Sequence, residues 1–284
     1  MHLWDFTIDN DKINVYICQK IKMSGSKTQI KEILDKYHKK YNNPDFIIND
    51  PISIPHRFSS KQDIEISGFW TAMIAWGRRN MIIKNATRLF ALMDNAPYDF
   101  IVNHQEKDRK RFLDFKHRTF QPLDTLYFLE FLQWYYRVND SLETAFSGFL
   151  TENDPDIKPA LTGFHDLFFS LDNAPDRTKK HVATPVRKST CKRLNMFLRW
   201  MVRKDDNGVD FGIWHDIKPS QLMIPVDVHV DRIARQLGLL TRKQRDWFAV
   251  EEITDNLKKY DPVDPVKYDF ALFGIGVMEQ FQNN

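Results

Sequence analysis

In the middle of this chain the apolar side chains recur at helical spacing. Ile66, Phe69 and Met73 lie on one face of a helix that ends before Gly77-Arg-Arg-Asn. A second apolar stripe starts at Ile82 and continues at i+4 and i+7, so the two segments form an αα-hairpin. The core segments show none of the sustained period-two alternation of a half-buried strand. The sequence therefore predicts an all-α fold.

Further stretches share this helical period. Helices are expected over 28–41, 82–93, 97–105, 108–116, 122–136, 140–150, 159–171, 190–202, 228–237, 246–259 and 265–280. Residues 42–60 contain three prolines and are expected to form a loop. Residues 1–22 are expected to be an extension outside the core, because their weak alternation over 12–22 suits only a short strand without an obvious partner.

Composition narrows the class of protein. The 284 residues are 42% hydrophobic and 13% aromatic, which is enough for a large core without disulfides or a structural metal. No run approaches the roughly 20 apolar residues that span a bilayer, and the first residues lack a signal-peptide pattern. Cys18 and Cys191 cannot form a disulfide framework or an iron–sulfur site, and the histidines are scattered. We expect a soluble, cytoplasmic protein without membrane contact, metal or cofactor.

Basic residues concentrate in one segment. Residues 177–204 contain ten lysines and arginines and no acidic residue. The whole chain has 41 basic and 38 acidic residues, so the remainder carries 31 basic against 38 acidic ones. Such a contrast is typical of a segment that binds a polyanion, although a charge run can also be a solvated helix face.

Lys192 stands in the first turn of the expected helix, which Ser189 or Thr190 would cap. The positive end of the helix dipole and three neighbouring cations disfavour a charged ammonium there. A lysine that is partly neutral at pH 7 is a usable amine nucleophile. The alternative is a lysine that contacts phosphate or solvent.

Asp227 is the second candidate for chemistry. It follows Pro225 and precedes the helical pattern of Val230 and Ile233, which predicts that it caps that helix. A carboxylate fixed at a helix start is also well placed to act as a general base or to stabilise a cation. Capping is the expected structural role in either case.

Together the two motifs resemble the helix–hairpin–helix DNA glycosylase superfamily, which includes endonuclease III and the 8-oxoguanine DNA glycosylases. Lys192 opens a helix after a hairpin, and Ile224-Pro-Val-Asp-Val-His, which is especially similar to the 8-oxoguanine branch, opens the next helix. The turn Arg78-Arg-Asn resembles the DNA-facing loop of those enzymes, and Tyr268-Asp-Phe-Ala-Leu-Phe-Gly-Ile-Gly resembles their closing helix. From Met23 onward the chain resembles more closely still an uncharacterised bacterial family that is placed beside these glycosylases.

This resemblance implies a DNA glycosylase with AP-lyase activity. Lys192 matches the Schiff-base lysine and Asp227 the invariant aspartate of the bifunctional enzymes, which implies excision of an oxidised purine such as 8-oxoguanine from double-stranded DNA. The residues expected to contact DNA are Arg78, Arg79, Asn80, Lys179, Lys180, Arg187, Lys188, Ser189 and Arg193. The candidates for a base pocket are Trp76, Phe120, Trp134, Trp200 and His229.

Three features depart from the family pattern. The hairpin Val186-Arg-Lys-Ser-Thr-Cys-Lys lacks the Gly-x-Gly turn whose N–H groups hold a phosphate. Lys192 and Asp227 are 35 residues apart, which is similar to the archaeal 8-oxoguanine glycosylases and longer than in endonuclease III. The iron–sulfur cysteines of endonuclease III are absent from the C-terminal part.

The expected architecture is two helical lobes with a cleft between them. Residues 63–204 would form the central lobe with the hairpin, and residues 23–62 together with 205–284 would form the second lobe. We expect a monomer that grips DNA and flips a damaged nucleotide into the cleft. Two other functions stay open: a non-catalytic helix–hairpin–helix DNA-binding protein, which the missing glycines favour, and a helical protein-interaction scaffold.

Overall fold

The computed structural model describes residues 26–278. In this range the fold is all-α, as the sequence predicts, and the extended backbone pairs only at an isolated bridge between His117 and Phe120. The extension predicted for residues 1–22 lies outside the described residues. Within the described range no helix is long and apolar enough to cross a membrane.

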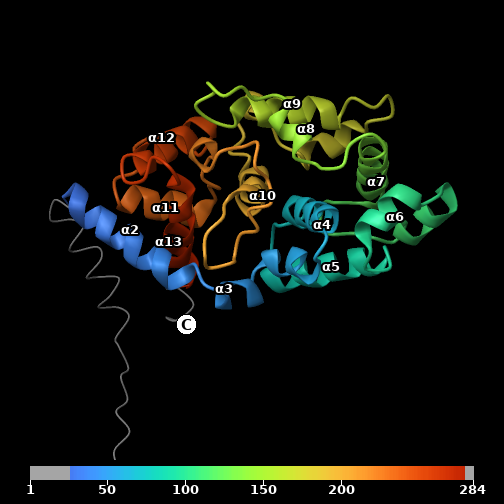
Figure 1. Cartoon of the computed structure of the whole chain (residues 1–284), viewed down its shortest axis with the longest axis horizontal. Coiled ribbons are helices and arrows are strands. Elements are labelled where there is room, and N and C mark those ends of the chain that lie inside the picture. Colours follow the sequence, from blue (N-terminus) through green and yellow to red (C-terminus); the bar gives the residue numbers. More distant parts are fainter. Residues whose placement is uncertain (1–25, 279–284) are drawn as a thin grey trace, which may run out of the picture.

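Apart from α3, the α-helices form two groups, with one helix between them (Figure 1). The central group contains α4 (Lys61–Met73), α5 (Arg79–Ala91), α6 (Pro97–Asn103), α7 (Pro122–Tyr136), α8 (Thr144–Ser147) and α9 (Lys158–Phe168). The C-terminal group contains α2 (Lys27–Tyr41), α11 (Val228–Gln236), α12 (Trp247–Lys258) and α13 (Asp269–Phe273). Helix α10 (Lys192–Val202) lies between the groups and packs against α4.

Short elements connect these helices. They are α3 (Asp45–Ile48), the 3-10 helices η1 (Pro51–Ser53), η2 (Pro55–Arg57), η3 (Glu106–Phe112), η4 (Asp176–Lys180), η5 (Pro185–Arg187), η6 (Pro219–Gln221) and η7 (Pro265–Tyr268), and the π-helix η8 (Gly274–Met278). Most of these 3-10 turns start with a proline, which fixes the backbone for a helical turn. The loop expected over 42–60 thus contains three short helical turns.

Some expected helices are shorter or of another type. The segment 140–150 forms only α8, because Glu65 accepts the backbone N–H of Leu142 and the chain leaves the helix at Gly148. In place of the helix expected over 108–116 the chain forms the 3-10 helix η3, which ends at Phe112, and the last expected helix divides into η7, α13 and η8.

Helix α4 is the centre of the core. Every residue from Ile64 to Met73 is buried, including the carboxylate of Glu65. Helix α4 approaches the second half of α10 closely at Gly68, where a Cβ would lie 3.1 Å from Cε of Met201 and 3.4 Å from the Phe197 ring. The buried helix α4 therefore supports α10 along the face that carries Phe197 and Met201.

Two segments outside the central helices pack against them. Helix α2 packs on α13, whereas η1 packs against α4 and α5, and η2 packs against α4. The connection after α10 also returns to the central group, where Trp214 donates its indole N–H to Glu65 (2.7 Å). Residues 51–57 and 214–216 thus contact the central helices.

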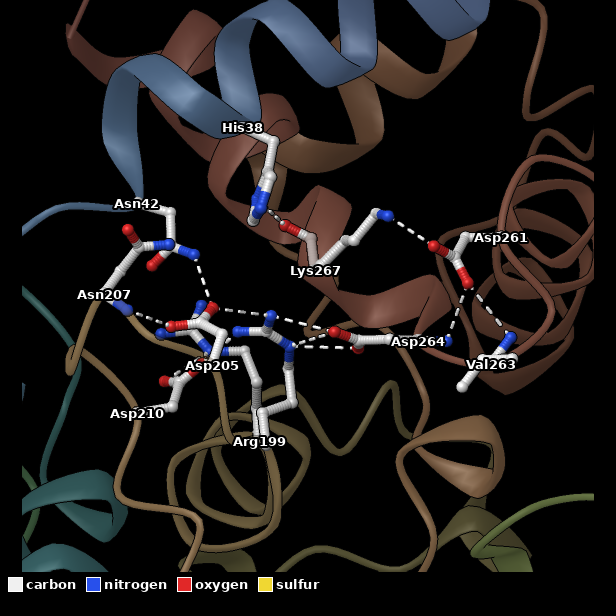
Figure 2. A network of polar contacts seen from close by, with 11 residues as sticks. His38, Asn42, Arg199, Asp205, Asn207, Asp210, Asp261, Val263, Asp264 and Lys267 are labelled. Atoms are coloured by element: carbon white, nitrogen blue, oxygen red, sulfur yellow. Dashed lines mark hydrogen bonds and ion pairs between the residues drawn. The ribbon is translucent and has the colours of Figure 1, made fainter.

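A buried network of ion pairs joins α10 to the C-terminal group (Figure 2). Arg199 donates to Asp210 (3.2 Å) and to Asp269 of α13. Arg203, one turn later, donates to Asp264 (3.0 Å) and also to Asp210. The network therefore links the helix that carries Lys192 to the segment that leads into α13.

Candidate active site

A cavity of about 800 Å³ opens where α3, α5, α10, α11 and α13 meet. Its walls carry an unusual density of charge. The ionisable residues that line it are Asp50, Arg78, Arg79, Lys192, Arg193, Arg199, Asp227, His229, Arg245 and Asp269. The volume lies within the range of small-molecule and cofactor sites.

Lys192 and Asp227 meet on the wall of this cavity. Lys192 Nζ lies 3.7 Å from Asp227 Oδ2, and both side chains keep about a quarter of their surface exposed (27% and 22%). Asp227 Oδ1 accepts the backbone N–H groups of His229 (2.9 Å) and Val230 (3.0 Å). The prediction that Asp227 caps its helix is confirmed, and the cap leaves the second oxygen free to face the lysine.

The hairpin before α10 makes its turn without glycine. Lys188 (φ +57°) and Cys191 (φ +48°) both adopt the left-handed conformation, which costs a non-glycine residue on the order of 1 kcal/mol. Trp247 donates its backbone N–H to the carbonyl of Lys188 (3.2 Å) and so holds the turn. The N-cap of α10 is Cys191, not Ser189 or Thr190 as predicted, because the chain turns one residue later.

The first turn of α10 has no side-chain cap. Ser189 Oγ accepts the N–H of Cys191 (3.2 Å), one residue before the helix starts. A small cavity of about 130 Å³, lined by residues 189–194 and His181, opens beside this turn. The N–H groups of a helix start can bind an anionic oxygen, so the turn keeps the donors that a phosphate contact needs.

Trp76 forms an aromatic wall of the cavity. Its ring stacks on His181 (centroids 5.6 Å apart), the Arg193 guanidinium lies 4.9 Å from its centroid, and His117 meets its edge. Trp200 and His229 line the same cavity, and His229 Nδ1 lies 3.1 Å from the carbonyl oxygen of Gly276. These contacts hold the rings in place.

Two predicted pocket residues lie elsewhere. Phe120 is fully buried and packs against Phe128 and His181 without reaching the cavity. Trp134 lies on α7, is 40% exposed, and does not line the cavity. Trp134 lies on α7 and Phe120 lies just before it. Both are outside the cavity because α7 lies on the side of the central group away from α11 and α13 (Figure 1).

The predicted DNA contacts divide between surface and interior. Arg78 and Arg79 line the cavity and Asn80 is exposed beside them. The exposed cations near the hairpin are Lys180, Arg187 and Lys188, while Lys179 pairs with Asp176 and Ser189 is partly buried.

Arg193 lines the cavity and is held by two backbone carbonyl groups. It donates to the carbonyl of Met73 at the end of α4 and to the carbonyl of Lys180 (3.2 Å). Burial lowers the pKa of Arg193 to about 10. Arg199 and Arg203 of the same basic segment are buried in ion pairs. Fewer of the ten lysines and arginines in residues 177–204 are therefore exposed to solvent than the sequence suggests.

Sequence reasoning did not name four charged residues of the cavity as site candidates: Asp50, Arg199, Arg245 and Asp269. Burial raises the pKa of Asp269 to about 6, although Arg199 opposes that shift. Asp269 belongs to the segment from Tyr268 that the sequence had already singled out, whereas nothing in the loop around Asp50 marks a functional residue. Within residues 26–278 no group of three His, Cys, Asp or Glu side chains could hold a metal ion.

Comparison with known proteins adds one match. The sequence model of a family described as "Protein of unknown function (DUF2400)" matches residues 50–278. No curated protein and no solved structure matches the chain. The matched range includes every ionisable cavity residue named above.

Proposed function

This chain belongs to the DUF2400 family of proteins of unknown function, and we propose that it is a DNA glycosylase with AP-lyase activity that removes an oxidised purine from double-stranded DNA. The observation that carries the proposal is the Lys192–Asp227 pair, 3.7 Å apart at the starts of two helices and open to a cavity. An amine nucleophile beside a fixed carboxylate is the arrangement that imine-forming catalysis needs.

In the proposed reaction a damaged nucleotide leaves the duplex and enters the cavity. The Lys192 amine attacks C1′ of the sugar, the bond from C1′ to the base breaks, and the sugar ring opens to an imine. The imine then allows β-elimination of the 3′ phosphate. Asp227 Oδ2 is placed to take a proton from the lysine and to stabilise positive charge on the sugar.

The residues that line the cavity are suited to bind a nucleotide. Trp76 contributes an aromatic ring to the cavity wall, next to which the flipped base would lie. Arg78 and Arg79 line the same cavity and Arg187 and Lys188 are exposed at the hairpin, so cations stand where the DNA backbone would pass. The preference for an oxidised purine, 8-oxoguanine first, rests on the resemblance of the segment around Asp227 alone.

Salt dependence tests the contact with DNA. Affinity for duplex DNA should fall steeply with salt, and each lost phosphate contact should reduce the slope of log K against log salt by about 0.9. The double reversal Arg187→Glu, Lys188→Glu should weaken binding to every duplex and flatten that slope. The same charge change at Lys107 and Lys110, in η3 after α6, is the matched control. It should leave the affinity for duplex DNA and the salt slope unchanged. Equal effects of the two double variants in a titration by fluorescence anisotropy would argue against a DNA contact at the hairpin.

Asp227→Asn separates capping from chemistry. Asparagine caps a helix about as well as aspartate, so the melting temperature should stay close to that of the wild type. Single-turnover base release should fall by about 100- to 1,000-fold, because the charge that stabilises the sugar cation is gone. Asp246→Asn, a change at the cap of α12, is the control and should leave base release intact. Full activity of the Asp227 variant would remove this residue from the mechanism.

A further inference from the structure

One carboxyl group of the cavity has no part in the chemistry described so far. Asp50 lies between α3 and η1, is 7% exposed, and lines the cavity together with Lys192 and Asp227. Its Oδ1 accepts the N–H of Ile52 (3.1 Å) and so caps η1. Its Oδ2 forms no hydrogen bond or ion pair with any residue of the range 26–278.

Burial of the Asp50 carboxyl group opposes its ionisation. Burial raises the pKa of Asp50 above its ordinary value, and the Ile52 N–H and the cations Arg79, Arg199 and Lys192 offset this only in part. The charged and titratable groups that share the cavity from the other elements are Arg78 of the turn before α5, Arg193 of α10, Asp227 and His229 of α11, Arg245 of the loop before α12, and Asp269 of α13.

The other buried carboxyl group of the cavity, Asp269, is already paired with an arginine. Asp269 accepts a hydrogen bond from Arg199, which stabilises its charged form, although burial raises its pKa to about 6. Asp227 is engaged by its helix cap and by Lys192. Among the described residues, Asp50 is therefore the buried carboxyl group of the cavity that has no hydrogen bond or ion pair with a cationic side chain.

We propose that Asp50 is the general acid that protonates the departing base, an assignment that rests on the proposed glycosylase function. The Asp50 hydroxyl gives its proton to a ring nitrogen or carbonyl oxygen of the base. The bonding pair of the C1′–N bond leaves with that base, which departs neutral. The Lys192 amine supplies the electron pair of the new C1′–N bond and then loses a proton to Asp227 or to water. Asp50 is left as a carboxylate and regains its proton from solvent.

The assignment makes a prediction about pH. A general acid works only in its protonated form, so base release should fall as the pH rises through the pKa of Asp50. Cleavage of a preformed abasic site has no base to protonate, so the same residue should not matter there. This difference separates a proton donor from a residue that merely shapes the cavity.

The test uses the full chain and two duplexes, one with 8-oxoguanine and one with a preformed abasic site. Asp50→Asn keeps Oδ1 as the acceptor for Ile52 and should fold as the wild type does. It should lower single-turnover base release by about 100-fold or more, remove the alkaline fall of the pH profile, and leave abasic-site cleavage unchanged. Asp50→Glu should restore part of the base release, and Asp45→Asn, an exposed acid five residues earlier, should change nothing.

Several results would overturn the assignment while the proposed function stands. These are equal base release by wild type and Asp50→Asn, and an equal loss of base release and abasic-site cleavage. A wild type that cleaves abasic sites but releases no base would refute the glycosylase function as well. A wild type that neither cleaves abasic sites nor forms a borohydride-trapped adduct would instead refute the glycosylase function, and the role of Asp50 with it.

Discussion

Replacing Lys192 with glutamine should abolish the covalent protein–DNA adduct that borohydride traps on a lesion-bearing duplex. Only an amine can form the imine that borohydride reduces, and glutamine has none. Strand cleavage should disappear with the adduct, because β-elimination proceeds through that imine. Duplex affinity should change little, since Lys192 is one of many cations near the DNA path and is only 27% exposed. The measurement is gel analysis of trapped adducts beside a binding titration.

Lys180→Gln is the matched control for this variant. Lys180 lies in the same basic segment and is exposed, so its loss removes the same charge without touching the cavity. It should trap DNA as the wild type does. Undiminished trapping by Lys192→Gln would show that another amine attacks the sugar, and the active site would then have to be placed elsewhere.

Replacing Arg203 with methionine should cost more stability than any surface change. The Arg203 side chain is 1% exposed and is paired with Asp205, Asp210 and Asp264. Methionine fills much of the same space but leaves these carboxylates without their shared cation. Breaking a buried ion pair by removing one partner lowers the free energy of unfolding by about 3–5 kcal/mol. Urea denaturation followed by circular dichroism measures this directly.

Arg57→Met provides the comparison. Arg57 is exposed and donates to Thr87 (2.8 Å), so its replacement should change the free energy of unfolding by about 0.5 kcal/mol or less. A loss at Arg203 no larger than at Arg57 would mean that the network in Figure 2 does not hold the C-terminal group to α10.

Local patterns were enough to predict most of the helices and one half of the site. Helix α7 and the cap at Asp227 follow from apolar spacing, Pro122 and a single acid before a helix, which are signals confined to a few residues. The pairing of Lys192 with Asp227 across 35 residues came from the resemblance to a known family and not from spacing. The structure places the two side chains together.

The remaining features depend on contacts that a linear pattern does not contain. Nothing local indicates that Lys188 and Cys191 adopt left-handed backbone conformations, since both residue types usually avoid them. The sequence does not indicate that Arg193 donates a hydrogen bond to the end of α4, because the two segments are far apart in the chain. Asp50 becomes a cavity residue only because η1 packs against α4 and α5.

The most direct test of the account is covalent trapping of the wild-type chain, followed by mass spectrometry of the adduct. The chain should be incubated with duplexes that contain an abasic site or 8-oxoguanine, reduced with borohydride and digested. The account predicts a DNA-derived mass on the peptide that contains Lys192. Duplex binding without any adduct would contradict the proposed catalysis and would indicate a DNA-binding protein that is not an enzyme. An adduct on another lysine would contradict the assignment of Lys192 as the nucleophile.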